Sequence, residues 1–281
     1  MFSKLSKRVR DSLSFAGWSV GAVSTFLTVI GYSLRDLFHE AGILANILAV
    51  FAAIMILFFA AYIFIGCKHR NRVKLTIRGT EVEICCGDIF GMNGLRVIGC
   101  DTHFDTRADN VVISKTSLHG RLVLEHGEVP KIKKAIKGAA QRLHLARDHR
   151  GQYSFPLGSI VKYTNENKEV FLMLAMTELN EDYESHTNMA LFEQMLMNMW
   201  KEIDRVYNGE PVSIPLLGTG MTRFDDGEKD NATLLRCMLC TLNASGVKLK
   251  SQVKIVIQDN KEKMPLYEFK DALRIVPGST H

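Results

Sequence analysis

The stretch IPLLGTGMTRF, residues 214–224, is an apolar run that stops abruptly at Gly-Thr-Gly. Two glycines one residue apart, directly after a strand-like run, indicate a tightly bent backbone. Such a loop often surrounds a phosphate, because no Cβ blocks the approach of its N–H groups. The stretch therefore predicts a phosphate-binding loop at the carboxyl end of a strand.

On both sides of this loop, strand-like and helical segments alternate. We expect strands at 73–79, 81–87, 96–100, 159–163, 169–179, 212–217 and 253–259, and helices at 129–144, 187–207, 228–244 and 265–273. Strands that alternate with helices predict a largely parallel sheet covered on both faces. Ligands of such sheets bind beyond the carboxyl ends of the strands, where the glycine loop falls.

Two uncharged stretches, 12–34 and 41–65, precede this domain. Each exceeds the roughly 20 apolar residues that cross a bilayer core. We therefore expect a basic cytosolic tail at 1–11, transmembrane helices at 12–34 and 41–67, an external loop at 35–40 and a cytosolic domain at 68–281. Basic residues on both outer flanks predict that both termini are cytoplasmic. A cleaved secretory signal is the alternative for the first stretch.

Charge and cysteine content narrow the function classes. The net charge is +5 over 281 residues, and no array of arginines and aromatic residues indicates nucleic-acid binding. Cys237 and Cys240 form a CxxC within an apolar helical pattern, with no second cysteine or histidine pair nearby. This favours core thiols over a metal or redox site, so we expect no metal site.

Three segments in order carry a resemblance: CGDIF at 86–90, ISKTSLHG at 113–120 and the glycine loop. Together they resemble the macrodomain, a three-layer α/β/α module with a mixed, largely parallel sheet that binds ADP-ribose. The resemblance implies that Asp88 accepts a hydrogen bond from the adenine amino group, with Ile89 beside it. It also assigns the diphosphate and distal ribose to Leu217, Gly218, Thr219, Gly220, Met221, Thr222, Arg223 and Phe224.

The chain departs from macrodomains that hydrolyse ADP-ribose linkages. Their asparagine-rich loop is replaced here by VIGCDTHFDTRADN at 97–110, and the first phosphate loop keeps only one glycine. With two spans in front, this combination resembles the divergent macro domain of the Thoeris antiphage effectors of the ThsA family. The further ligand contacts that this implies are Asp101, Phe104, Ser117, Leu118, His119 and Gly120. Asp101 and Asp105 also fit loop caps, while His103 and His119 also fit general bases or plain loop residues.

This resemblance implies an effector that is not an enzyme and has no catalytic residues or cofactor. Its signal would be an ADP-ribose derivative, histidine-ADP-ribose, made by a partner TIR protein. Binding would rearrange an oligomer, disrupt the bacterial inner membrane and abort the infection. A homo-oligomer is expected because the two helices of one chain cannot enclose a pore. The alternatives are a membrane-anchored ADP-ribosyl hydrolase and a purely structural membrane anchor.

Overall fold

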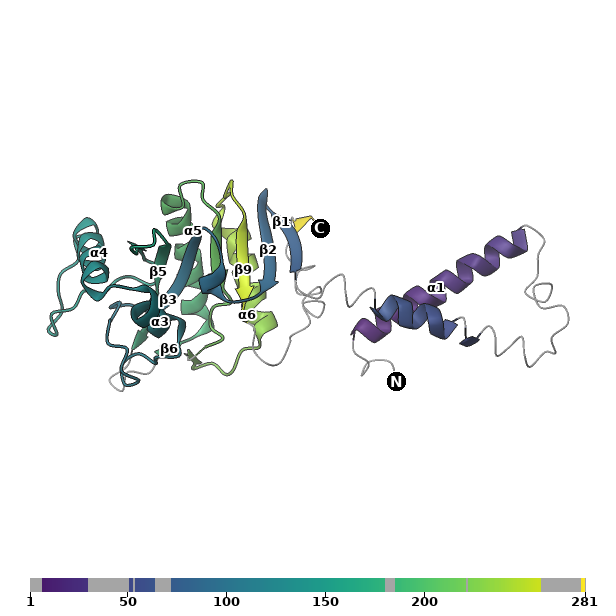
Figure 1. Cartoon of the computed structure of the whole chain (residues 1–281), viewed down its shortest axis with the longest axis horizontal. Helices are drawn as coiled ribbons and strands as arrows, with labels where there is room; N and C mark the ends of the chain where they lie inside the picture. The colour runs from purple at the N-terminus through teal and green to yellow at the C-terminus, as the bar shows by residue number, and fades with distance from the viewer. Residues whose placement is uncertain are drawn as a thin grey trace. The chain divides into compact units, whose positions relative to one another are not determined.

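The computed structural model describes residues 7–29, 51–52, 54–63, 72–179, 185–220, 222–258 and 279–280 (Figure 1). The chain divides into two compact units, and the larger one begins at Arg72.

The N-terminal unit contains helix α1 (Lys7–Val29) and a helical stretch at 51–52 and 54–63. Helix α1 begins inside the segment that was expected to be a tail. Within the described residues, no helix combines the length and the apolar character needed to cross a membrane. Residues 30–34 of the first expected span, the expected loop at 35–40, and residues 41–50, 53 and 64–67 of the second span lie outside the described part of the chain.

The larger unit is built on one mixed sheet. Its strands are β1 (Arg72–Ile77), β2 (Thr80–Cys86), β3 (Leu95–Asp101), β4 (Ile160–Thr164), β5 (Val170–Leu179), β6 (Ser185–Thr187), β7 (Val212–Pro215), β8 (Arg223–Phe224), β9 (Val253–Ile257) and β10 (Ser279–Thr280). They lie in the order β10-β1-β2-β9-β7-β3-β5-β6-β8, and β4 also pairs with β5. The central run β2-β9-β7-β3-β5 is parallel, whereas β1 and β4 pair antiparallel. The predicted mixed, largely parallel sheet is confirmed.

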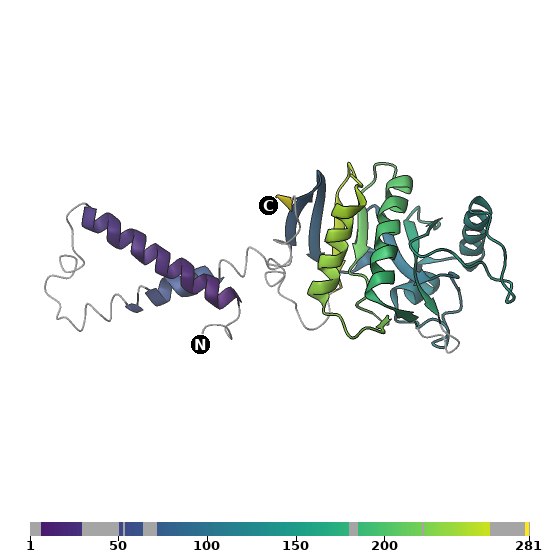
Figure 2. The same cartoon turned by 180° about the vertical axis from the view of Figure 1, so that it is seen from behind.

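Helices cover both faces of the sheet. They are the 3-10 turn η3 (Ile89–Gly91), α3 (Leu118–Arg121), the π-helical turn η4 (Leu122–His126), α4 (Val129–Arg142), α5 (Met189–Val206) and α6 (Asn231–Ser245). Helices α5 and α6 lie side by side over one face (Figure 2). Residues of η4 and α4 pack on the other face. The expected helix at 265–273 lies outside the described residues.

Periodicity explains the layers. Alternate β5 residues Phe171, Met173 and Ala175 join a buried cluster with Ile132 and Ile136 of α4. The intervening β5 residues are equally buried, because the opposite face is covered as well. Helices α5 and α6 start at residues whose side chains cap them, whereas Glu128 in front of α4 makes no such bond. For example, Asp230 accepts a hydrogen bond from the Thr233 amide at 2.7 Å, so α6 begins three residues later than predicted.

Gly158 lies just before β4 and packs against α5, so a substitution there tests this packing. Its φ is +88°, and an added Cβ would lie 2.7 Å from the Met195 carbonyl oxygen. We expect Gly158→Ala to lower the free energy of unfolding by about 3 kcal/mol, from left-handed strain plus overlap. The matched control is Gly151→Ala, at φ +74° with no described atom within 4 Å, for which we expect a loss of about 1 kcal/mol. If urea unfolding shows the same loss in the free energy of unfolding for both variants, this packing is contradicted.

Candidate ligand-binding site

The predicted site segments share one edge of the sheet. Asp88 follows β2, Asp101 ends β3, and the glycine loop follows β7. Because these strands belong to the parallel run, their carboxyl ends point the same way. Neighbouring strands lie about 5 Å apart, and η3 lies against β7. The three segments are therefore within the reach of one nucleotide-sized ligand.

Asp88 is both a helix cap and an ion-pair partner. Its Oδ1 accepts a hydrogen bond from the Phe90 amide at 3.2 Å. The Arg121 guanidinium donates to Oδ1 at 3.3 Å and to Oδ2 at 3.0 Å. These bonds from Arg121 are the main reason that the pKa of Asp88 lies below its usual value. The Asp88 side chain is 49% exposed, so part of it still faces solvent. The Ile89 side chain is buried in the core, which leaves only its main chain to face a ligand.

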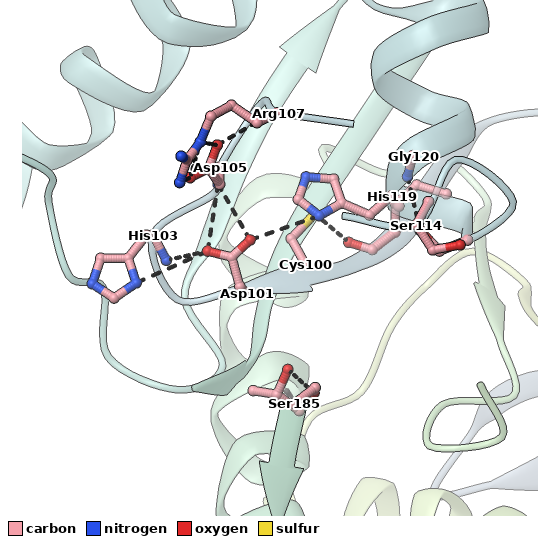
Figure 3. Close-up of polar contacts among 12 residues, drawn as sticks. Cys100, Asp101, His103, Asp105, Arg107, Ser114, His119, Gly120 and Ser185 are labelled. Carbon is pink, nitrogen blue, oxygen red and sulfur yellow. Dashed lines mark hydrogen bonds and ion pairs between the residues drawn. The ribbon is translucent and has the colours of Figure 1, made fainter. Parts of the chain in front are cut away.

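Asp101 organises the turn after β3. Its Oδ1 accepts from the His103 amide at 2.8 Å, and its Oδ2 accepts from the Asp105 amide at 3.2 Å (Figure 3). The carboxylate is buried, and the backbone of its own loop supplies these donors. Asp101 therefore acts as a loop cap. Phe104, at φ +52°, is buried against Phe155 and lies in the core.

His119 lies beside Asp101 in the interior. The two side chains point toward each other (Figure 3). The distance from His119 Nδ1 to Asp101 Oδ2 is 3.8 Å, which is too long for a hydrogen bond. Burial lowers the pKa of His119, although the charges of Asp101 and Asp105 oppose that effect. Among the described atoms, its buried Nε2 has no hydrogen-bond partner. The imidazole is thus held neutral, with one ring nitrogen unused.

Three residues extend the acidic turn beyond the sequence prediction. Arg107 pairs with Asp105, with Nη2 2.8 Å from Oδ2. Gln152 donates to the same oxygen at 3.1 Å. Burial acts to raise the pKa of Asp105, but the hydrogen bonds from Arg107 and Gln152 and the charge of Arg107 together outweigh it, so the pKa lies below its ordinary value. Asp148 contacts the turn through His103, with its Oδ2 3.7 Å from His103 Nε2. Of these three residues, only Arg107 is close to Asp105 in the sequence, so only its contact with Asp105 could be suspected from the sequence.

Helix α3 connects the two aspartates. Ser117 caps the helix, because its Oγ accepts from the Gly120 amide at 3.0 Å. A side chain at Gly120 would collide with the Ser114 carbonyl, so glycine lets the turn close. From this one turn, His119 reaches toward Asp101 while Arg121 reaches Asp88. Leu118 packs against the core and is not aimed at the aspartates.

The glycine loop is anchored at its start and open at its end. The Leu216 amide donates to the Val256 carbonyl at 2.9 Å, and Thr219 Oγ1 donates to the Leu216 carbonyl at 2.9 Å. Gly218, at φ +84°, sits close to Leu234 and Phe224, while Leu217 is buried. At Gly220, an added Cβ would meet no described atom within 4 Å. The loop therefore leaves open space at its tip.

The end of the loop is tied to β6. Strand β8 pairs in parallel with β6, with Arg223 opposite His186 and Phe224 opposite Thr187. Phe224 also packs edge-on against Phe192 of α5, with ring centroids 5.5 Å apart. Thr222 is half-buried, and Met221 lies outside the described residues. This pairing fixes where the loop returns toward α6, which sequence spacing alone did not predict.

The CxxC thiols lie in α6, the helix that follows the glycine loop. Burial, the largest effect, raises the pKa of Cys237 to about 12. Such a thiol is not a thiolate at neutral pH. Among the described residues, no group of three cysteine, histidine or acidic side chains is arranged to hold a metal ion.

Comparisons with known proteins identify the family and the fold of the larger unit. A family model described as "Thoeris protein ThsA, Macro domain" matches residues 82–258, which is more than half of the chain. The chain belongs to the ThsA macro domain family. Thoeris protein ThsA of Bacillus amyloliquefaciens (strain Y2) is 27% identical over 281 residues, covering 95% of this chain and 92% of that relative.

The solved structures extend the likeness to the fold. The Oceanobacillus iheyensis macrodomain with ADP superposes with a TM-score of 0.50 at 15% identity, covering 72% of this chain and 95% of that one. The larger unit therefore has a macrodomain-like α/β fold with a mixed sheet. The ThsA family assignment makes this chain a macro domain protein of the Thoeris antiphage system.

His119 supplies a pH test of the buried turn. In the unfolded chain a histidine binds a proton with a pKa of about 6.5, and in the folded chain the pKa of His119 is lower. Below about pH 6.5 the unfolded state therefore binds more protons than the folded state, and folding stability falls as the pH falls. We expect urea unfolding between pH 7.5 and 5.5 to show a shallower pH dependence in His119→Asn. An identical dependence in both proteins would contradict a neutral, buried imidazole.

Proposed function

We propose that the chain is a signal-gated effector whose macro domain binds an ADP-ribose derivative. The signal would be histidine-ADP-ribose, made by a partner TIR protein. The observation that carries the proposal is the meeting of Asp88, helix α3 and the open tip of the glycine loop at one sheet edge, in a chain of the ThsA macro domain family.

Each part of the site suits part of such a ligand. The half-exposed carboxylate of Asp88 only accepts hydrogen bonds, which fits the exocyclic amine of adenine. Gly218 and Gly220 let the main chain approach the diphosphate closely. A positive φ at Gly218 turns the loop in a way that other residues rarely adopt. The macrodomain of Oceanobacillus iheyensis with ADP supports a nucleoside diphosphate as the ligand class.

The N-terminal unit would act on the bilayer. The uncharged stretches 12–34 and 41–65 are long enough to span a membrane as two helices, with both termini in the cytoplasm. Differential affinity of the ligand for two arrangements of an oligomer would drive the rearrangement that disrupts the inner membrane.

A membrane-anchored ADP-ribosyl hydrolase is the alternative. The position of the asparagine-rich loop of hydrolytic macrodomains is taken here by the turn around Asp101. Asp101 and Asp105 receive hydrogen bonds from that turn and from Arg107 and Gln152. This arrangement supports a structural role for the turn, and thus a sensor rather than a catalyst.

Calorimetric titration of the full chain with ADP-ribose, followed by product analysis, tests the proposal. We expect saturable binding without turnover. Asp88→Ala should weaken binding by about tenfold, because a hydrogen bond to a charged acceptor is lost. Gly220→Ala should weaken binding without changing the free energy of unfolding, since its methyl group meets no described protein atom.

Asp204→Ala, an exposed aspartate on α5, is the matched control and should bind as the parent does. Product formation would support the hydrolase instead. Both functions would be contradicted if the parent chain binds no ADP-ribose and Arg121→Ala, which removes the ion-pair partner of Asp88, does not bind it either.

A further inference from the structure

Arg121 occupies the carboxylate that the proposed adenine contact requires. Its guanidinium takes both oxygens of Asp88, at 3.3 and 3.0 Å. The same guanidinium lies over the Phe90 ring, with Cζ 4.4 Å from the ring centroid. Phe90 is only 7% exposed, so the ring is buried while Arg121 remains in place.

These contacts imitate a bound base. A guanidinium is flat, donates N–H groups in one plane and stacks on aromatic rings. Adenine would present the same features to Asp88 and Phe90: a planar ring system and an amino group that donates. A carboxylate has about four acceptor sites, and the Phe90 amide and Arg121 already use three of them. One acceptor site remains, but the guanidinium also covers the Phe90 ring, so a base that stacks on Phe90 and pairs with Asp88 must take the place of Arg121.

We propose that Arg121 is a latch on the adenine end of the site, which the base must displace from Asp88. The inference rests on the proposed function, since it assumes that the base binds at Asp88. It adds a residue that controls the affinity for the ligand. The latch keeps the carboxylate paired when no ligand is bound, and only a base that donates a hydrogen bond to Asp88 replaces what Arg121 gives up.

The structure provides a place for the released side chain. Arg121 Nε already lies 3.3 Å from Glu125 Oε2, one helical turn further along. Glu125 belongs to the π-helical turn η4, and π-helical turns occur often at functional sites. The same turn carries His126, whose ring stacks on Phe90 at 4.3 Å with an interplanar angle of 1°. Glu125 Oε2 also lies 3.9 Å from His126 Nε2, so movement of Arg121 toward Glu125 would change the surroundings of the ring that stacks on Phe90.

The latch acts on any base that reaches Asp88. Adenine donates to a carboxylate through its amino group, whereas hypoxanthine has a carbonyl oxygen at that position and donates through the neighbouring N1–H group. Either base must displace Arg121 to reach both Asp88 and the Phe90 ring. Removing Arg121 should therefore raise the affinity for ADP-ribose and for inosine diphosphate ribose by similar factors.

The test is titration of the full chain and its variants with ADP-ribose and with inosine diphosphate ribose. Arg121→Ala should bind ADP-ribose about three- to tenfold more tightly, since a partly exposed ion pair and a cation–π contact no longer compete. Arg121→Lys keeps the charge but loses the planar fork, and should bind about twofold more tightly. Arg205→Ala removes a comparable pair with Glu202 on α5 and should change nothing.

The outcomes separate the latch from the function beneath it. Weaker or unchanged binding in both Arg121 variants, with a parent chain that binds ADP-ribose, overturns the latch and leaves the proposed function standing. Binding by Arg121→Ala but not by the parent supports both. No binding by the parent or by any variant overturns the proposed function and the latch with it.

Discussion

The parallel pairing of β2, β9, β7, β3 and β5 is the constraint on which the rest of the structure depends. Parallel strands end on the same side, so three segments far apart in the sequence meet at one edge. Both faces must be covered, which accounts for the near-continuous burial of the central strands and for helices on each side. The edge itself stays free for loops, and the polar residues of the site lie there.

Helix α3 contacts two of the segments at this edge. In a single turn it directs one basic side chain to Asp88 and an imidazole toward Asp101. The two aspartates have different environments. Asp88 is half exposed and held by a cation, whereas Asp101 is buried and held by the amides of its own turn. The proposed function therefore uses Asp88, the exposed one, as the recognition residue, whereas Asp101 holds its own turn.

Sequence patterns predicted the sheet well because alternation and apolar runs are local properties. Strands β1, β2, β3, β4, β5, β7 and β9 lie within a few residues of their expected places. The Arg121–Asp88 pair was not predictable, since 33 residues separate the partners and only tertiary packing brings them together. The burial of Ile89, Phe104 and Leu217 was also hidden, because a motif shows which residues surround a ligand but not which of them point inward. The β6–β8 pairing was missed for the same reason as the ion pair.

Hydrogen–deuterium exchange of the full chain, with and without ADP-ribose, tests the central claim most directly. The claim is that the segments after β2 and β7 and the helix α3 form the walls of one ligand site. Saturating ADP-ribose should slow exchange at residues 88–91, 117–121 and 216–220 together, with the same dependence on ligand concentration. Protection of only one of these segments, or protection confined to other parts of the chain, would contradict the account.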